Sequence, residues 1–153
     1  MLTLHTPTLE ELSFRQSLLS DEQTMSYNAR WGGTISFSRD RWEGWYDRWV
    51  AHPQGKRFYA YLHSEKDGFV GETGCHLDED GRWIVDIIVH SRFRGRGYGT
   101  QGLALLCEQC RKMGCTVIYD DIAKDNPSLS LFLKQGFCTV ETTDDGVIVR
   151  KYL

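Results

Sequence analysis

The segment 89–100, Val-His-Ser-Arg-Phe-Arg-Gly-Arg-Gly-Tyr-Gly-Thr, places arginines and alternating glycines between an apolar run and a helix-like run. Glycines let the backbone turn tightly and approach a ligand closely. The N–H groups of a first helical turn point at such a ligand, and the helix dipole favours negative charge there. Arg94 and Arg96 add positive charge. The segment therefore predicts an anion site that would fit a pyrophosphate.

Other phosphate-binding patterns do not match this segment. Gly95, Gly97 and Gly99 alternate, so they do not form the dinucleotide fingerprint, and no Gly-Lys-Ser/Thr follows as in a Walker A loop. A glycine-rich loop with solvated arginines is the purely structural alternative. The order of strand, loop and helix favours the anion site, because that order presents free N–H groups to a ligand.

The elements that position this segment are predicted from hydrophobic periodicity. Strands joined by short turns should pair antiparallel, whereas the strand–helix–strand crossover around the anion segment should join two parallel strands. We therefore predict an α+β fold over residues 1–153 as a single domain. It has a central mixed, mostly antiparallel sheet, helices on both faces and one parallel βαβ crossover. The predicted strands are 2–5, 58–62, 69–77, 83–89, 116–119, 137–142 and 147–152, and the predicted helices are 8–19, 39–51, 97–113 and 127–135, with 25–37 irregular.

Composition excludes several classes of protein. The net charge of -3 provides no basic field for nucleic acid. No apolar run reaches the roughly 18 residues of a membrane span. The first residues do not match a signal peptide, so the cytoplasm is the expected compartment. The 5 cysteines are odd in number, which disfavours a disulfide framework, and Cys107 and Cys110 lack the matching pair that a zinc site needs. No metal is therefore expected.

Two motifs resemble those of the GNAT superfamily of N-acyltransferases. Arg94-x-x-Gly97-x-Gly99 resembles its Arg/Gln-x-x-Gly-x-Gly/Ala signature, with Ser91 where a proline is frequent. The stretch 131–137, Leu-Phe-Leu-Lys-Gln-Gly-Phe, resembles its helix ending in Gly-Phe. The resemblance covers about residues 58–153. It implies a GNAT-like fold and an acetyl-CoA-dependent N-acetyltransferase that acts on a primary amine of a small molecule or peptide by direct attack.

The resemblance also implies where coenzyme A would bind. The turn's backbone N–H groups would hold the pyrophosphate, and strand 83–89 would pair with the pantetheine arm like an added strand. The thioester would lie in the gap before the next parallel strand, with an N–H near Val89 facing the oxyanion. The implied coenzyme-site residues are Ile87, Ile88, Val89, Arg94, Gly95, Arg96, Gly97, Tyr98, Gly99, Thr100, Asn126, Ser128 and Phe132.

The sequence departs from the family at the proton donor for the thiolate. The usual tyrosine, four residues before the glycine of Gly-Phe, is replaced by Phe132, which carries no proton to give. A branch of the family has an Asn-x-x-Ser pattern, and Ser128 has that serine's spacing, with Asp125 in the asparagine's place and Asn126 one residue out of register. Ser128 is either a contact to the coenzyme sulfur or an ordinary polar residue of the first helical turn.

The general base is predicted among three carboxylates. An amine must be neutral to attack a thioester, so a base has to take its proton. Asp86 and Asp121 are the first candidates and Glu72 the third, with a structural carboxylate as the alternative role. Some family members carry Glu or His at the positions of Trp83 and Val85. Because Asp86 has the opposite parity, a bulge would be needed to turn it to that side.

The acceptor is expected under the first two helices, a region rich in aromatic residues. Core packing explains most of them, and one or two would line an acceptor pocket. A coenzyme A-binding regulatory module without catalysis is the competing hypothesis, and whether the chain forms a homodimer is left open. The aromatic residues are Tyr27, Trp31, Trp42, Trp45, Tyr46 and Trp49.

Overall fold

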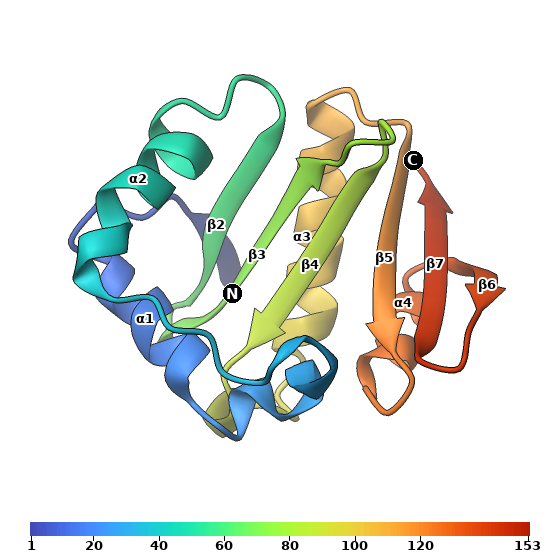
Figure 1. Ribbon diagram of the computed structural model, residues 1–153, viewed down its shortest axis with the longest axis horizontal. Coiled ribbons are helices and arrows are strands. Elements are labelled where there is room, and N and C mark those ends of the chain that lie inside the picture. Colours follow the sequence, from blue (N-terminus) through green and yellow to red (C-terminus); the bar gives the residue numbers. More distant parts are fainter.

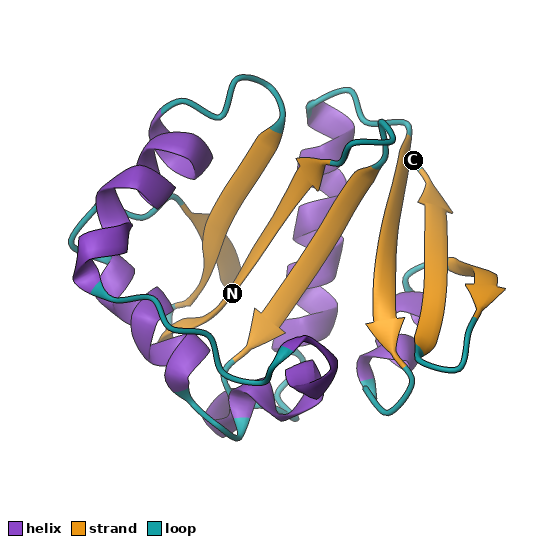
Figure 2. Cartoon of the chain, viewed as in Figure 1, coloured by secondary structure: helices purple, strands orange, loops and turns teal.

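The structure is a computed structural model that describes residues 1–153, apart from the side chain of Trp31. Its strands form one sheet in the order β1-β2-β3-β4-β5-β7-β6 (Figures 1 and 2). β4 and β5 are parallel and the other neighbours are antiparallel, which confirms the predicted fold class. The strands are β1 Leu2–His5, β2 Arg57–Ser64, β3 Gly68–Leu77, β4 Trp83–Val89, β5 Val117–Ala123, β6 Cys138–Thr142 and β7 Gly146–Tyr152.

Helices cover both faces of the sheet (Figure 1). α1 and α2 bury Leu12, Trp42 and Trp45 against the aromatic rings of β2 on one face. α3 buries Leu103 and Leu106 against β4 and β5 on the other. The helical segments are α1 Leu12–Ser20, η1 Thr24–Trp31, η2 Arg39–Arg41, α2 Trp42–Tyr46, η3 Asp47–Ala51, η4 Ser91–Phe93, α3 Tyr98–Lys112 and α4 Ser128–Lys134.

The two parallel strands separate along their length. Their pairing runs from Trp83 opposite Ile118 to Ile84 opposite Tyr119, and then β4 and β5 diverge (Figure 1). Beyond Ile84, the β5 side of β4 therefore carries backbone groups without a β5 partner. This divergence opens the predicted gap, at the carboxyl ends of the two strands where open sheets bind ligands.

Three predicted elements differ from the structure in ways that matter for the site. The predicted helix 39–51 consists of a 3-10 turn, α2 and the π-helical η3. The predicted irregular stretch 25–37 contains η1. The predicted strand 116–119 extends to Ala123 because β7 pairs with it along its whole length, which places Asp120 and Asp121 inside the sheet. Propensity alone does not indicate such an extension, since cross-strand pairing supplies it.

The helix start near Thr8 has the predicted capping box. Thr8 N–H donates to Glu11 Oε1 at 2.9 Å and Glu11 N–H donates to Thr8 Oγ1 at 3.3 Å. The turn continues from these bonds into α1, whose helical bonding is regular from Leu12. The reciprocal bonds satisfy N–H groups that the helix itself cannot. They fix the start of α1, and α1 carries Arg15, which lines the cleft described below.

The cysteines differ sharply in exposure. Cys75, Cys107, Cys110 and Cys115 are buried in the core beneath α3, and Cys138 is exposed on β6. Burial raises the pKa of the Cys107 thiol and raises that of Cys115 to about 11. Because the thiolate is the reactive form, we expect one fast-reacting thiol per native chain, at Cys138, in a titration with a thiol-specific disulfide reagent. Unfolding in denaturant should release the other four, whereas rapid native reaction of several thiols would contradict this core.

Candidate active site

The glycine-rich turn forms the entry to α3. Gly97 is the N-cap residue, with φ of 82°, and no side chain caps the helix. The first helical bond runs from Gln101 N–H to Gly97 O at 3.1 Å. The preceding N–H groups therefore point out of the helix N-terminus toward a ligand. The positive φ explains why a glycine is needed at this position.

The two arginines of the turn contact the protein itself. Arg94 donates to Thr24 O at 2.8 Å and lies 5.3 Å from the Tyr27 ring centroid. Arg96 pairs with Asp67 at 3.0 Å. The expectation that both simply add charge to an anion site is thus modified. The hydrogen-bond partners of Arg94 are carbonyls, which do not neutralise its positive charge. The charge of Arg96 is neutralised by Asp67.

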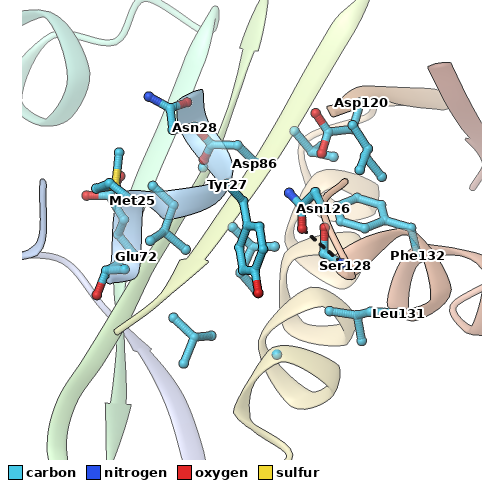
Figure 3. A pocket seen from close by; sticks show the side chains of 18 of the residues that line it. Met25, Tyr27, Asn28, Glu72, Asp86, Asp120, Asn126, Ser128, Leu131 and Phe132 are labelled. Carbon is cyan, nitrogen blue, oxygen red and sulfur yellow. Dashed lines mark hydrogen bonds between the residues drawn. The ribbon is translucent and has the colours of Figure 1, made fainter. Parts of the chain in front are cut away.

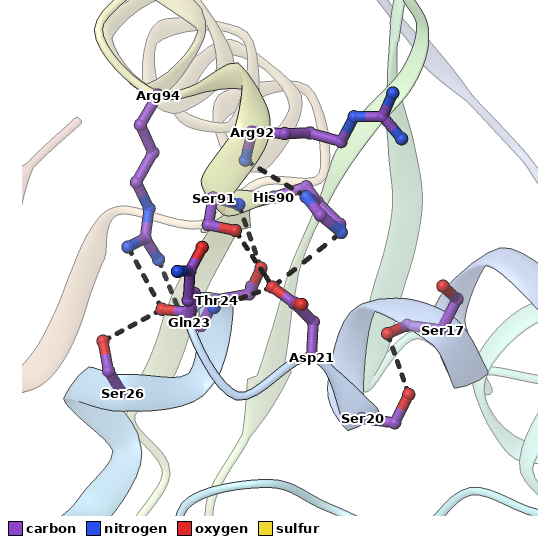
Figure 4. A network of polar contacts seen from close by, with 10 residues as sticks. All are labelled: Ser17, Ser20, Asp21, Gln23, Thr24, Ser26, His90, Ser91, Arg92 and Arg94. Atoms are coloured by element: carbon purple, nitrogen blue, oxygen red, sulfur yellow. Dashed lines mark hydrogen bonds and ion pairs between the residues drawn. The ribbon is translucent and has the colours of Figure 1, made fainter.

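A polar network joins η1 to the turn (Figure 4). The Asp21 carboxylate accepts from Thr24 Oγ1 at 2.5 Å and from Ser91 Oγ at 3.0 Å. Ser91 N–H in turn donates to Thr24 Oγ1 at 2.9 Å. The hydrogen bonds that Asp21 accepts, first from the Thr24 hydroxyl, then from the Thr24 N–H and the Ser91 hydroxyl, lower its pKa. Ser91, the position where a proline is frequent in the resembled family, thus fixes the wall of the cleft next to the anion turn.

A cleft of about 740 Å³ extends from this turn through the β4–β5 gap to the helices on the α1 face. All four predicted catalytic candidates line it, as do all the predicted coenzyme-site residues except Arg96 and Thr100. Figure 3 shows the central part of the cleft. Trp45, Trp49 and Tyr27 of the predicted aromatic set also line it, whereas Trp42 and Tyr46 donate hydrogen bonds to the backbone elsewhere. The side chain of Trp31 lies outside the described part of the chain.

Asp86 and Asp120 face the cleft from its two walls (Figure 3). The Asp86 side chain is exposed to water inside the cleft, whose walls surround it with protein. Desolvation by these walls raises the pKa of Asp86 to about 7, and the charge of Glu72 adds to the rise while Arg15 opposes it. Burial, and then the charge of Asp86, also raises the pKa of Asp120. A carboxyl with a pKa near neutrality can accept a proton from an ammonium group.

The predicted need for a bulge at Asp86 is wrong. β4 pairs with β3 in continuous register, with Asp86 opposite Gly74. Trp83 and Val85 share one side of the strand, and Val85 packs into the core beneath α3. Asp86 lies on the opposite side, which faces the cleft beneath α1. The alternation of the strand therefore places the Asp86 carboxyl in the cleft without any irregularity.

Glu72 is held by two partners. Its carboxylate contacts Arg15 Nη1 at 2.6 and 2.7 Å and accepts from the Tyr59 hydroxyl at 2.5 Å. The Arg15 guanidinium lies 4.4 Å from the Trp45 ring centroid and 4.9 Å from that of Phe37. The Glu72 carboxylate is almost completely buried and is already occupied by both partners. Glu72 is therefore less available than Asp86 to contact an acceptor.

Asp121 lies at the rim of the cleft. Its Oδ2 accepts from Arg30 Nη2 at 2.7 Å, and its side chain is 50% exposed. The ion pair joins η1 to β5 and gives this carboxylate a structural role.

The hydroxyl groups nearest the gap come from opposite walls. Ser128 begins α4, and its N–H donates to Asn126 Oδ1 at 2.9 Å. Phe132, one turn later, is buried and packs edge-on against Phe137. Tyr27 extends from η1 into the cleft (Figure 3), a donor that the sequence did not indicate. Ser128 and Tyr27 thus both bring a hydroxyl-bearing side chain to this part of the cleft.

The described residues contain no group of three or more His, Cys, Asp or Glu side chains that could hold a metal ion. None of the helices in this part of the chain is long and apolar enough to cross a membrane.

Comparison with known proteins identifies the family. The model of the acetyltransferase (GNAT) family matches residues 15–137. No curated protein matches the sequence. The chain therefore belongs to the GNAT family of acetyltransferases, as the two motifs predicted.

Solved structures share the fold at low identity. A spermidine N-acetyltransferase from Vibrio cholerae, in complex with CoA and spermine, is 19% identical with a TM-score of 0.77, covering 99% of this chain and 94% of that one. A GNAT superfamily phosphinothricin acetyltransferase from Sinorhizobium meliloti, in complex with AcCoA, is 15% identical with a TM-score of 0.78, covering 99% and 88%. PaiA N-acetyltransferase from Thermoplasma acidophilum, in complex with coenzyme A, is 12% identical with a TM-score of 0.72, covering 100% and 99%.

The raised pKa of Asp86 predicts a pH-dependent stability. The folded protein keeps this carboxyl protonated up to about pH 7, whereas its ordinary pKa is 3.8. The resulting stabilisation is complete below pH 3.8 and is lost as pH rises through 7. Asp86→Asn should therefore raise the free energy of unfolding at pH 8 by about 1–2 kcal/mol, an amount reduced from the full shift because water enters the cleft.

Thermal melts of both proteins at pH 5 and pH 8 test this expectation. The variant should gain most melting temperature at pH 8 and less at pH 5, where only part of the stabilisation has been lost. An equal gain at both pH values would show that packing, and not ionisation, causes the difference.

Proposed function

We propose that this protein transfers the acetyl group of acetyl-CoA to a primary amine by direct attack, with Asp86 as general base. The observation that carries the proposal is the position of Asp86. Its carboxyl faces the cleft where β4 and β5 separate, and the same cleft continues to the anion turn at Gly97. This arrangement would bring the acyl donor and the base into one cavity, as transfer between two bound reactants requires.

The turn and β4 would bind the acyl donor. The N–H groups at the start of α3 suit a pyrophosphate, and Arg94 contributes positive charge beside them. The unpaired backbone groups of β4 beyond Ile84 suit an amide-containing arm that adds to the sheet like a strand. N–H groups on this edge can also stabilise the oxyanion that forms when the thioester is attacked. The CoA complexes of the three similar structures support this assignment.

Asp86 would activate the acceptor. Alkyl ammonium groups have a pKa near 10, so the acceptor arrives protonated at neutral pH. The Asp86 carboxylate takes one proton from the ammonium group, and the neutral amine then attacks the thioester carbon. Its nitrogen forms a bond to that carbon while the carbon–sulfur bond breaks. Desolvation and the charge of Glu72 raise the pKa of Asp86, which suits this transfer.

The departing thiolate needs a proton, and Phe132 cannot supply it. We assign this donation to a hydroxyl in the gap, with Ser128 as the first candidate and Tyr27 as the second. Both line the cleft, and Tyr27 replaces a tyrosine of α4 with one from the opposite wall. The second nitrogen proton, lost as the amide forms, restores the proton that the hydroxyl gives to sulfur. Asp86 releases the first proton to water, so the reaction needs no further reactant.

A thiol-release assay with acetyl-CoA and a panel of amines tests the function. We expect amine-dependent release of free thiol with a matching amount of N-acetylated product by mass spectrometry. Binding of acetyl-CoA without product from any amine would contradict the proposed enzyme. The replacement of the usual tyrosine by Phe132 favours the alternative of a coenzyme A-binding regulatory module, and that outcome would support it.

A further inference from the structure

We propose that the acceptor is a primary amine with one positive charge and an apolar or aromatic body, and not a polyamine or an aminoglycoside. This inference rests on the proposed function and specifies its substrate class. It follows from the charges that remain uncompensated in the cleft and from the surface that lies beside them.

The charge available for a cationic acceptor is small. The carboxylates among the described lining residues are Glu72, Asp86, Asp120 and Asp121. Arg15 compensates Glu72 and Arg30 pairs with Asp121. Asp86 and Asp120 line the cleft without such a pair, and the charge of Asp86 raises the pKa of Asp120, which favours a state in which the two carry a single negative charge. One ammonium group therefore satisfies the electrostatics of the cleft.

The surface beside Asp86 is aromatic and aliphatic. Trp45 and Trp49 stack with a centroid distance of 5.9 Å, and the Tyr59 ring lies edge-on 4.6 Å from Trp45. All three rings line the cleft together with Ile84. The ring centroid of Trp49 also lies 5.9 Å from that of His76. His76 is paired with Ile84 in the β3–β4 register. An apolar body would thus extend from the amine along this wall.

Two backbone features shape the wall. Gly74, opposite both Tyr59 and Asp86, has no side chain to fill the cleft, and an added Cβ would lie 2.6 Å from Phe58 O. The π-helical η3 ends with His52 N–H donating to Asp47 O at 2.7 Å, and Trp49 lies within it. A π-helical turn changes the direction of side chains relative to an α-helix. Both features leave room for an apolar group in front of Asp86.

A second ammonium group on the acceptor would be unfavourable here. It would have to lose hydration against the aromatic wall without a counter-ion, because the remaining carboxylates are already paired. An apolar body gains from the same surface by leaving water. The cleft therefore favours acceptors whose end remote from the reacting amine is uncharged.

Matched pairs of amines test this preference with the wild-type protein and acetyl-CoA. Hexylamine and 1,6-diaminohexane have the same chain and differ by one ammonium group, and 2-phenylethylamine and ethylamine differ by one aromatic ring. We expect kcat/KM to be at least about 10-fold higher for hexylamine than for the diamine, and at least about 10-fold higher for the phenyl compound than for ethylamine. Spermidine and kanamycin should be poor acceptors.

A variant locates the preference in the wall. Trp49→Leu should reduce kcat/KM for 2-phenylethylamine about 10-fold and change that for ethylamine less than about 3-fold, because ethylamine does not reach the ring. Trp42→Phe, in the adjoining α2 but outside the cleft, is the matched control and should preserve the ratio between the two substrates. The ratio within each variant is independent of any loss of folded protein.

The outcomes separate this inference from the function on which it rests. Preference for the diamine, spermidine or kanamycin would overturn the inference and leave amine acetylation intact. An unchanged substrate ratio in Trp49→Leu would overturn the role of the aromatic wall. Acetyl-CoA binding without turnover of any amine would overturn the proposed function itself.

Discussion

Asp86→Asn should lower kcat about 10²–10⁴-fold at pH 7, equivalent to about 3–5 kcal/mol of barrier, and leave the affinity for acetyl-CoA nearly unchanged. Asparagine keeps the shape of the side chain but cannot accept the ammonium proton. The anion turn at Gly97 belongs to a different element, so coenzyme binding should not depend on this carboxylate. Steady-state kinetics and calorimetric titration with acetyl-CoA measure the two quantities separately.

Asp121→Asn is the matched control for this variant. It removes the same charge from the same cleft, but its carboxylate is paired with Arg30 at the rim. We expect kcat to change less than about 10-fold, far less than the loss of a general base produces. Full activity of Asp86→Asn at pH 7, with a folded melt, would contradict the assignment of the base. A larger loss in Asp121→Asn than in Asp86→Asn would transfer that role to Asp121.

Gly97→Val should weaken acetyl-CoA binding at least about 100-fold, because several N–H bonds to the pyrophosphate would be lost at roughly 1.5–3 kcal/mol each. The φ of 82° is unfavourable for a β-branched residue, so the turn must change its backbone conformation. The N–H groups at the start of α3 would then no longer converge. Titration of acetyl-CoA into the folded variant measures the loss.

Gly81→Val separates this effect from general strain. Gly81 has φ of 80° and open space around it, but it lies in the turn between β3 and β4. The substitution should cost a similar amount of stability and leave acetyl-CoA affinity within about 3-fold of the parent, since no N–H group of α3 is affected. Equal affinities of Gly97→Val and the parent protein would refute the anion-turn assignment.

The part of the site built from one continuous segment could be predicted from the sequence. The anion turn needs only a strand, glycines and a helix start in order, and the structure places all three as expected around Gly97. The capping box at Thr8 is equally local. Such features depend on backbone geometry within a few residues, so the pattern of residue types carries the information.

The acceptor side depends on contacts between distant segments, which the sequence does not reveal. Arg15 reaches Glu72 across 57 positions, and Arg30 reaches Asp121 across 91. These pairings decide which carboxylate stays uncompensated. The side of β4 that Asp86 faces also differs from the prediction, since parity identifies a face only once the covering helices are known. Asp120 lies in β5 because β7 pairs with that strand as far as Ala123, and this pairing joins segments distant in the sequence.

The pH dependence of kcat/KM, measured for the parent and Asp86→Asn with one apolar primary amine, tests the central claim most directly. For the parent, kcat/KM should fall about 10-fold per pH unit below pH 7, because protonation inactivates a base whose pKa is raised to about 7. It should be level from pH 7.5 to 9, where the amine is still protonated in solution. The variant should lack this plateau and gain activity steadily toward pH 9, as bulk water supplies neutral amine. Parallel profiles for the two proteins, with the same plateau, would contradict the claim that Asp86 removes the proton.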